Sequence, residues 1–320
     1  MLMPRRLGVS QAIPELQRRS YVSLKIGVFQ ILPDRRGDPA IVAKAAEDLG
    51  FHSYWVPEHA IMPMSFASDY VGDPGNPPPD YLWQMPDPWV ALTRAATTTR
   101  SIRLGSGICL VPEHNPLILA KQVASVDHYS YGRVQFGIGA GWNREESEIL
   151  GVDFDHRWTQ TRECVEVMRK LWREDAPAHS GRYYKFPPLR SYPKPEQPAG
   201  PPVMFGSSGS ARVFKRVVEW GEGWIPVMSS LDEFAAGCLA LDAACTSAGR
   251  DRRSVHVAPF ALEGLYRTAA ERDQVAAAGA DELIIWIKAR ELDDILDELK
   301  QLAEELLDTQ GDTRTPDDDD

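Results

Sequence analysis

Glu58 and His59 are the first residues of this chain whose types suggest chemistry, because they follow a short apolar run at 53–56 after a single proline, Pro57. A carboxylate beside an imidazole at the end of a strand can exchange a proton with a ligand or hold it by hydrogen bonds. An isolated Glu-His pair also occurs as a loop cap, and this structural interpretation stays open. The HExxH spacing of a zinc site is missing, so we predict no metal site.

A second candidate is a run of alternating glycines, Gly137, Gly139 and Gly141, followed by Trp142 and Asn143. A dinucleotide-binding fingerprint requires G-x-G-x-x-G at the first strand-to-helix turn, whereas this run keeps a G-x-G-x-G rhythm and ends the fourth predicted strand. We therefore exclude a Rossmann phosphate loop. Alternating glycines remove side chains from one face of a strand, which favours either a flat floor for a planar ring or close packing against a neighbouring element.

The segment 206–210, with the sequence GSSGS, leads from an apolar run directly into a helical pattern that carries Arg212 and Arg216. Small residues at a helix N-terminus present backbone N–H groups to an anion, so the segment predicts a phosphate site. The alternative is an ordinary helix N-cap at Ser208 or Ser210.

Two other stretches depart from simple strand and loop patterns. The third predicted strand contains Gly105 and Gly107, which indicate a bulge, a close approach by another group, or tight packing. The segment 60–87 is long, contains three consecutive prolines and lacks periodicity, and loops of such length are usually functional or mobile. Its aromatic residues either line a lid over a pocket or pack the loop down: Phe66, Tyr70, Tyr81 and Trp83.

Short apolar runs alternate with longer helical patterns along the whole chain. Most of the runs are continuous, as expected for strands buried on both faces of a parallel sheet. The predicted strands are 24–30, 53–56, 102–110, 134–139, 202–205, 223–226, 255–261 and 282–287. The predicted helices are 39–49, 88–99, 116–128, 157–172, 210–220, 231–248, 269–278 and 292–307. Eight such repeats favour an α/β fold with a single (β/α)8 TIM barrel, and a doubly wound sheet is the alternative.

The composition excludes several classes of protein. The 320 residues include 46 acidic and 35 basic side chains, and the net charge of −11 argues against nonspecific nucleic-acid binding. No segment has the length and apolarity of a signal peptide or a membrane span. We expect a cytoplasmic protein with buried thiols and no CxxC pair, the cysteines being Cys109, Cys164, Cys238 and Cys245. The chain divides into a loosely ordered extension at 1–22, a barrel at 23–309 and a disordered acidic tail at 310–320.

Together the strand-end residues resemble the luciferase-like monooxygenase superfamily and, within it, the branch that uses the deazaflavin coenzyme F420. The similar stretches lie within residues 24–290 and include GFHSYWVPEH at 50–59, the segment 87–146, and PPVMFGSSGSARVFKRVVEWGEGW at 201–224. The NPxxLAK pattern at 115–121 and the SxGR turn at 130–133 are specific in combination. Many relatives have Gly-Gly-x-Ser in the phosphate loop where this chain has GSSGS, so the pattern of donors stays open.

The resemblance implies a barrel with an insertion before strand 5, which corresponds to 186–202 here. The segment 60–87 is predicted as a further insertion, after strand 2, and has no clear counterpart in the family. It also implies a cis peptide bond between Gly107 and Ile108, behind the central ring of the cofactor. His59, Glu58 and Trp142 are the implied catalytic residues, with His59 or Glu58 as proton donor or ring polariser and Trp142 stacking at the pocket. The implied cofactor-binding residues are Gly107, Ile108, Ala140, Gly141, Trp142, Gly206, Ser207, Ser208, Gly209 and Ser210.

The activity implied by the resemblance is hydride transfer between coenzyme F420 and a small organic substrate. An FMN-dependent two-component monooxygenase, fed by a partner reductase, is the alternative, because both cofactors carry a ring and a phosphate. A barrel that binds flavin or deazaflavin without turnover is the second alternative. We expect a homodimer formed through the helices that follow the second and third strands, and no nucleic-acid or membrane partner.

Overall fold

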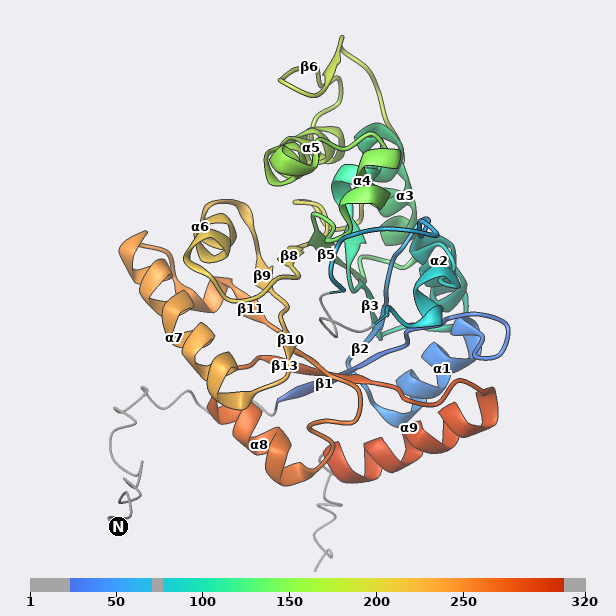
Figure 1. Cartoon of the computed structure of the whole chain (residues 1–320). Helices are drawn as coiled ribbons and strands as arrows, with labels where there is room; N and C mark the ends of the chain where they lie inside the picture. The colour runs from blue at the N-terminus through green and yellow to red at the C-terminus, as the bar shows by residue number, and fades with distance from the viewer. Residues whose placement is uncertain (1–23, 71–76, 308–320) are drawn as a thin grey trace, which may run out of the picture.

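A computed structural model describes residues 24–70 and 77–307 of the chain (Figure 1). The extension expected at 1–22 and the acidic tail expected at 310–320 lie outside these residues. Within the described part of the chain, no helix combines the length and apolarity needed to cross a membrane.

The architecture is an α/β fold built on a curled parallel sheet, with helices along its outside (Figure 1). The pairings run from β13 through β1, β2, β3 and β5 to β8, then to β9 and β11, while β10 and β12 connect back to β13. The strands of this sheet are β1 (Lys25–Phe29), β2 (Ser53–Val56), β3 (Arg103–Ser106), β4 (Cys109–Leu110), β5 (Val134–Gly139), β8 (Val203–Phe205), β9 (Gly223–Trp224), β10 (Val227–Met228), β11 (His256–Val257), β12 (Phe260–Ala261) and β13 (Glu282–Trp286).

Local signals account for where several helices begin. Helices α1, α2 and α3 each start at a proline, and the residue before it, Asp38, Asp87 or Asn115, accepts a hydrogen bond from a backbone N–H of the first turn. The backbone N–H at this position has no partner within a helix, so proline, which lacks the N–H, loses no hydrogen bond there. These helix starts therefore follow from sequence alone. The helices are α1 (Pro39–Leu49), α2 (Pro88–Thr98), α3 (Pro116–Tyr129), α4 (Arg144–Ile149), α5 (Arg157–Arg173), α6 (Ala211–Trp220), α7 (Leu231–Ser247), α8 (Ala269–Ala277) and α9 (Leu292–Leu306).

Three predicted strands are interrupted. The run 223–226 is only half strand, because β9 ends at Trp224 and β10 begins after the run, at Val227. The run 255–261 becomes β11 and β12, and Pro226 and Pro259 lie in the two gaps. Proline has no N–H to donate to a neighbouring strand, which explains both breaks. The run 102–110 becomes β3 and β4, separated by Gly107 and Ile108, and the peptide bond between these two residues is cis, as expected.

The sequence patterns did not predict helix α4 or the antiparallel hairpin of β6 (His179–Ser180) and β7 (Lys185–Phe186). The hairpin lies between α5 and β8, at the edge of the molecule (Figure 1). The carboxylate of Glu163 on α5 accepts hydrogen bonds from the backbone N–H groups of Arg182, Tyr183 and Tyr184 and so holds the hairpin loop.

The core has two parts. The larger one packs the sheet against the helices, and the smaller one fills the space inside the curl with the aromatic rings of Phe29, Trp55 and Phe260. Phe260 contacts Phe29 and Trp55 edge to face, at centroid distances of 5.2 and 5.4 Å. Both faces of the sheet are therefore buried, as the continuous apolar runs predicted. Ile108 and Trp286 lie partly exposed beside the inner part, where the strands end.

Candidate active site

The side chain of His59 lies in a chain of hydrogen bonds that joins three separate segments. Its Nδ1 atom lies 2.7 Å from Glu146 Oε2, and its Nε2 atom accepts a 3.2 Å hydrogen bond from the indole N–H of Trp142. His59 follows β2, Trp142 follows β5, and Glu146 lies in the first turn of α4. The side chains of His59 and Glu146 are 8% and 1% exposed. The imidazole is therefore held between a buried carboxylate and an aromatic ring.

These two partners determine the tautomer of His59. An indole N–H only donates hydrogen bonds, so the Nε2 atom that faces Trp142 carries the lone pair. An ionised carboxylate only accepts, so Nδ1 carries the proton and donates it to Glu146. A carboxylate that holds one ring nitrogen and leaves the other as a base is the arrangement that activates histidine in hydrolases. The lone pair on His59 Nε2 can therefore accept a proton.

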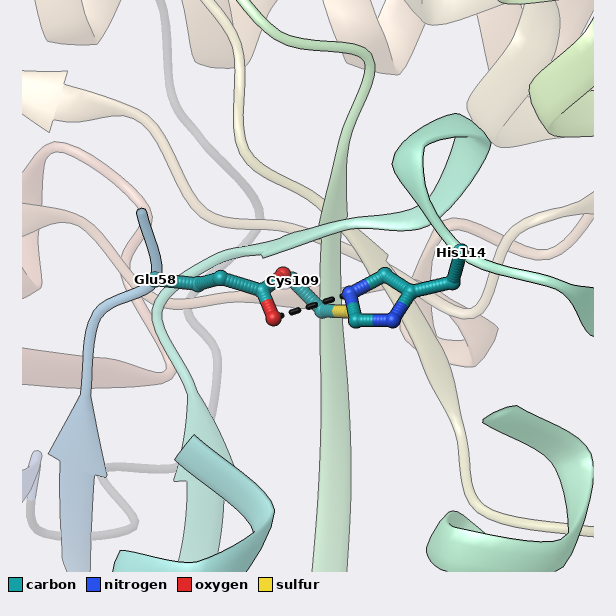
Figure 2. Close-up of side chains that lie close together, drawn as sticks. All are labelled: Glu58, Cys109 and His114. Atoms are coloured by element: carbon teal, nitrogen blue, oxygen red, sulfur yellow. Dashed lines mark hydrogen bonds and ion pairs between the residues drawn. The ribbon is translucent and has the colours of Figure 1, made fainter. Parts of the chain in front are cut away.

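The carboxylate of Glu58 belongs to a separate cluster with Cys109 and His114 (Figure 2). Its Oε2 accepts a 2.6 Å hydrogen bond from the backbone N–H of Leu110, and its Oε1 lies 2.8 Å from His114 Nε2. Burial raises the pKa of Glu58 and lowers that of His114, but their mutual hydrogen bond and charge outweigh burial. The net result is a lowered pKa for Glu58 and a raised pKa for His114, as in an ion pair.

Glu58, Cys109 and His114 have the chemistry of metal ligands, and their ligand atoms lie within 4.8 Å of one another. Both Glu58 oxygens are already used in hydrogen bonds, however. Burial, together with the charge of Glu58, raises the pKa of the Cys109 thiol well above its usual range, whereas metal binding requires the thiolate. We therefore interpret this cluster as a hydrogen-bonded structural group that ties β2 to β4.

A second buried carboxyl group, that of Glu113, lies near Glu146. Its Oε1 accepts a 2.8 Å hydrogen bond from Ser147 Oγ. Burial, followed by the charge of Glu146, raises the pKa of Glu113 to about 8. A Cβ atom added to Gly141 would lie 2.8 Å from Glu113 Oε1 and 2.9 Å from Ser147 Oγ, and Gly141 has a φ of +82°. Only glycine therefore fits over this carboxyl group without displacing it.

Trp142 also connects this network to the proline-rich segment. Phe66 and Tyr70 contact the Trp142 ring edge to face, at centroid distances of 5.9 and 5.5 Å. The backbone N–H of Ala67 and the hydroxyl of Ser68 donate hydrogen bonds to Glu145 on α4. The first part of the segment thus packs over the candidate site. Trp83, by contrast, is 50% exposed.

The alternating glycines at the end of β5 accommodate protein atoms. A Cβ atom at Gly137 would lie 2.1 Å from the carbonyl oxygen of Ser106, and one at Gly139 would lie 2.0 Å from Ile108 Cδ1. A Cβ atom at Gly206 would lie 2.3 Å from Ile108 Cγ2. Gly137 and Gly139 therefore allow close packing of protein atoms. The partly exposed Ile108 side chain rests on Gly139 and Gly206. Ala140, directly after β5, is buried.

The segment Gly206 to Ser210 lies at the start of α6. Ser210 caps this helix, since its Oγ accepts a 3.3 Å hydrogen bond from Val213 N, while Ser208, Gly209 and Ser210 are exposed. The N-cap alternative for Ser210 is thus correct. It leaves the other small residues beside the positive end of a helix dipole, where an anion is stabilised.

Arginines gather at the same corner. Burial lowers the pKa of Arg216, and the charges of Arg212 and Arg157 lower it further, so the three cations lie within electrostatic reach of one another. Arg157 also donates a 3.2 Å hydrogen bond to the carbonyl oxygen of Gly141, which joins this corner to the His59 network. Mutually repelling arginines beside a helix N-terminus have the chemistry required to bind a phosphate group.

The sequence was compared with known protein families. The model of the luciferase-like monooxygenase family matches residues 37–320. The chain belongs to this family. Its fold agrees with that of the F420-dependent tetrahydromethanopterin reductase of Methanopyrus kandleri, with a TM-score of 0.72 and 16% identity over 88% of this chain and 98% of that one.

Relatives within the family use different cofactors. An uncharacterized protein of Mycobacterium tuberculosis, Rv0953c, is 38% identical over 208 residues, which are 64% of this chain and 73% of that protein. The F420-dependent hydroxymycolic acid dehydrogenase of the same species is 28% identical over 246 residues, 75% of this chain and 61% of that one. The oxygenase component of the flavin-dependent trigonelline monooxygenase of Acinetobacter baylyi is 29% identical over 164 residues, 51% and 40% of the two chains. The family thus contains both F420-dependent and flavin-dependent oxidoreductases.

Sequence reasoning missed the residues that complete the His59 network in this family member: Glu113, Glu146 and Ser147. A signal for Glu146 was present, because Asn143 is followed three positions later by an acidic residue, the pattern of a capped helix start. Asn143 Oδ1 accepts a 3.0 Å hydrogen bond from Glu146 N, which fixes this turn. No local signal pointed to Glu113.

Proposed function

We propose that this protein transfers a hydride between coenzyme F420 and a small organic substrate. The hydrogen-bonded series Trp142, His59 and Glu146 carries the proposal, because hydride transfer to a carbonyl or from an alcohol requires a group that supplies or takes up a proton. The F420-dependent dehydrogenase relative, matched over 75% of this chain, supports the choice of cofactor.

The cofactor would bind across the ends of the strands. Its phosphate group would lie at Gly206, Ser207, Ser208, Gly209 and Ser210, beside the three arginines. Its ring would lie against Gly107 and Ile108, bordered by Ala140, Gly141 and Trp142. Bound there, F420 supplies a ring carbon that gives or takes a hydride. The partly exposed apolar Ile108 side chain and the cationic corner both suit this ligand.

We assign the proton transfer with the substrate to His59 and not to Glu58, because both carboxylate oxygens of Glu58 already accept hydrogen bonds within the cluster. In alcohol oxidation the substrate hydroxyl would give its proton to His59 Nε2, and F420, if bound there, would supply the hydride acceptor. Glu146 then stabilises the imidazolium through Nδ1. Carbonyl reduction follows the same path in reverse. Trp142 must release Nε2 first, and would then border the pocket.

The cofactor is tested by titrating the purified protein with oxidised F420 and, separately, with FMN while following fluorescence. We expect saturable F420 binding that weakens about tenfold or more in Arg216→Ala, because a charged hydrogen bond to phosphate is lost. Lys300→Ala is the control, since Lys300 is an exposed cation on α9 that pairs with Asp297. Tight FMN binding without F420 binding would overturn the F420 proposal.

An FMN-dependent two-component monooxygenase is the second candidate. The trigonelline monooxygenase oxygenase component favours it, and a separate reductase would then be the partner. Substrate-dependent oxygen consumption with FMN and a reductase would establish this activity. Cofactor binding without turnover across alcohols, carbonyl compounds and activated alkenes would point to a barrel that binds flavin or deazaflavin without catalysis.

We infer further that the curled sheet closes as a (β/α)8 barrel in which β9 and β10 form one interrupted strand, as do β11 and β12. The parallel pairs β9–β11, β10–β12, β12–β13 and β13–β1 support this reading, and the segments 60–87 and 186–202 would be its insertions.

We also infer a homodimer through α2 and α3, where Val90 and Ile118 are 67% and 60% exposed. A monomeric mass for the native protein in light scattering would contradict the dimer.

A further inference from the structure

We propose that Glu113 and Glu146 share one proton, and that Glu113 is a positioning residue that sets the charge of the carboxylate holding His59. The shared proton is independent of the cofactor and the substrate. Its consequence for catalysis rests on the proposed role of His59.

The hydrogen bonds around the two carboxyl groups leave one buried oxygen of each without a partner. Glu113 Oε1 accepts a 2.8 Å hydrogen bond from Ser147 Oγ, and Glu146 Oε2 accepts a 2.7 Å hydrogen bond from His59 Nδ1. Glu113 Oε2 and Glu146 Oε1 are both inaccessible to solvent and have no hydrogen-bond partner. A buried carboxylate oxygen without a donor costs free energy, and a proton on Glu113 removes the charge from one of these two buried groups.

The surroundings of Glu113 contain more negative charge than positive. The charges of Glu146 and Glu58 both raise the pKa of Glu113, while the Ser147 hydroxyl lowers it. The nearby Cys109 thiol stays neutral because its own pKa is raised. The imidazoles in the region, those of His114 and His59, already pair with Glu58 and Glu146. Two like charges in a buried site cannot both persist at low cost, so one of the two carboxyl groups retains a proton.

The position of the proton follows from the partners. Glu146 accepts from His59, which favours its ionised form, whereas Glu113 has only a neutral hydroxyl donor. Glu113 is therefore the protonated member of the pair. Gly141, whose added Cβ would lie 2.8 Å from Glu113 Oε1, packs against the Glu113 carboxyl group.

The shared proton matters for His59. While Glu113 is protonated, the pair carries one negative charge, and His59 faces a carboxylate that is partly neutralised by its neighbour. When Glu113 ionises, the His59 imidazole faces two negative charges instead of one. A step that needs His59 to give up a proton then slows as pH rises through about 8.

Infrared difference spectroscopy of the protein without cofactor tests the shared proton directly. We expect the C=O stretch of a protonated carboxylic acid at neutral pH, its loss as pH rises through about 8, and its absence in Glu113→Gln. Glu148→Gln, an exposed acid on α4, is the control and should retain the band. Absence of this band from the wild-type protein at neutral pH would overturn the proposal.

A pH profile of kcat/KM for carbonyl reduction separates the positioning role from a merely structural one. The amide of Glu113→Gln still accepts a hydrogen bond from Ser147 Oγ but cannot ionise. Glu113→Gln should therefore lose the wild-type decline near pH 8. An unchanged alkaline decline would overturn the positioning role. If no turnover is found with any cofactor, the infrared result still decides whether the proton is shared.

Discussion

At the scale of single residues, neighbours in the sequence have separate tasks. Glu58 and His59 are adjacent, but Glu58 ties β2 to β4 through Leu110, while His59 faces Glu146 and Trp142. A side chain used fully for structure has no free lone pair for a ligand, whereas His59 retains one at Nε2 that only a single indole N–H covers. The difference between these two residues concentrates the candidate chemistry on His59.

Replacement of Glu146 tests this assignment. Glu146→Gln keeps the size of the side chain but removes the charge that stabilises a protonated His59. We expect kcat to fall about 10²- to 10⁴-fold, by analogy with carboxylates that orient catalytic histidines. Steady-state kinetics at saturating cofactor measures the effect. His59→Asn should lose a similar factor, and the double variant little more, because the two residues act as a unit. Full additivity of the two losses would contradict the pairing.

The raised pKa of Glu113 has a consequence for stability. Between the usual carboxyl value of 4.5 and about 8, the folded protein binds more protons at Glu113 than the unfolded chain, so stability falls as pH rises through this window. Glu113→Gln removes that loss. We expect a free energy of unfolding higher than wild type by about 2 to 4 kcal/mol above pH 8, shrinking toward pH 5. Urea denaturation at several pH values measures it, and a pH-independent difference would contradict the raised pKa.

At the scale of elements, the short helix α4 delivers two residues of the network in consecutive positions. Glu146 faces His59 and Ser147 faces Glu113, and this requires that the helix begin at Arg144. Asn143, buried and bonded to Glu146 N, sets this start. The Glu145 contacts with Ala67 and Ser68 then bring the proline-rich segment against the same helix. The short helix α4 thus positions both the hydrogen bonds around His59 and the proline-rich segment that packs over them.

The cap of α4 can be tested against another cap. Asn143→Ala should lower the free energy of unfolding by about 1 kcal/mol and also reduce kcat, because the first turn of α4 loosens around Glu146. Ser230→Ala removes the cap of α7, which contributes no residue to the network, and should cost similar stability without a change in kcat. Equal activity of the two variants would mean that α4 holds Glu146 in place without its cap.

At the scale of the whole molecule, a buried carboxylate joins strands at the opposite ends of the sequence. Glu282 on β13 is fully buried, accepts a hydrogen bond from Ser53 on β2, and lies 3.1 Å from His256 on β11. Burial raises the pKa of Glu282, but the hydrogen bond and charge of His256 outweigh it, so the pKa is lowered. The contribution of the ionised Glu282 carboxylate to the free energy of unfolding is fully present above the usual pKa of a carboxyl group and is lost as pH falls through the lowered pKa.

Glu282→Ala should lower the free energy of unfolding by about 3 to 5 kcal/mol at neutral pH, because it leaves Ser53 and His256 without their buried partner. Chemical denaturation measures the loss, with the exposed Glu304→Ala as control. The difference from wild type should shrink below the pH at which Glu282 is protonated. A constant difference down to that pH would show that packing, not charge, accounts for it.

The sequence by itself determined most of the elements, since capping residues, prolines and apolar runs act over a few positions. The bounds 39–49, 53–56 and 134–139 agree with α1, β2 and β5. It also indicated the family and the cis bond between Gly107 and Ile108, through motifs that span the chain.

Only the tertiary structure determined which side chains of the candidate site contact one another. It directed Glu58 away from His59, placed the Ile108 side chain against Gly139 and Gly206, and brought Glu113 to Glu146. Each of these contacts joins side chains from strand ends or loops that are distant in the sequence. Their orientation depends on how the strands pair and how tightly side chains pack, and no local pattern of residues encodes that.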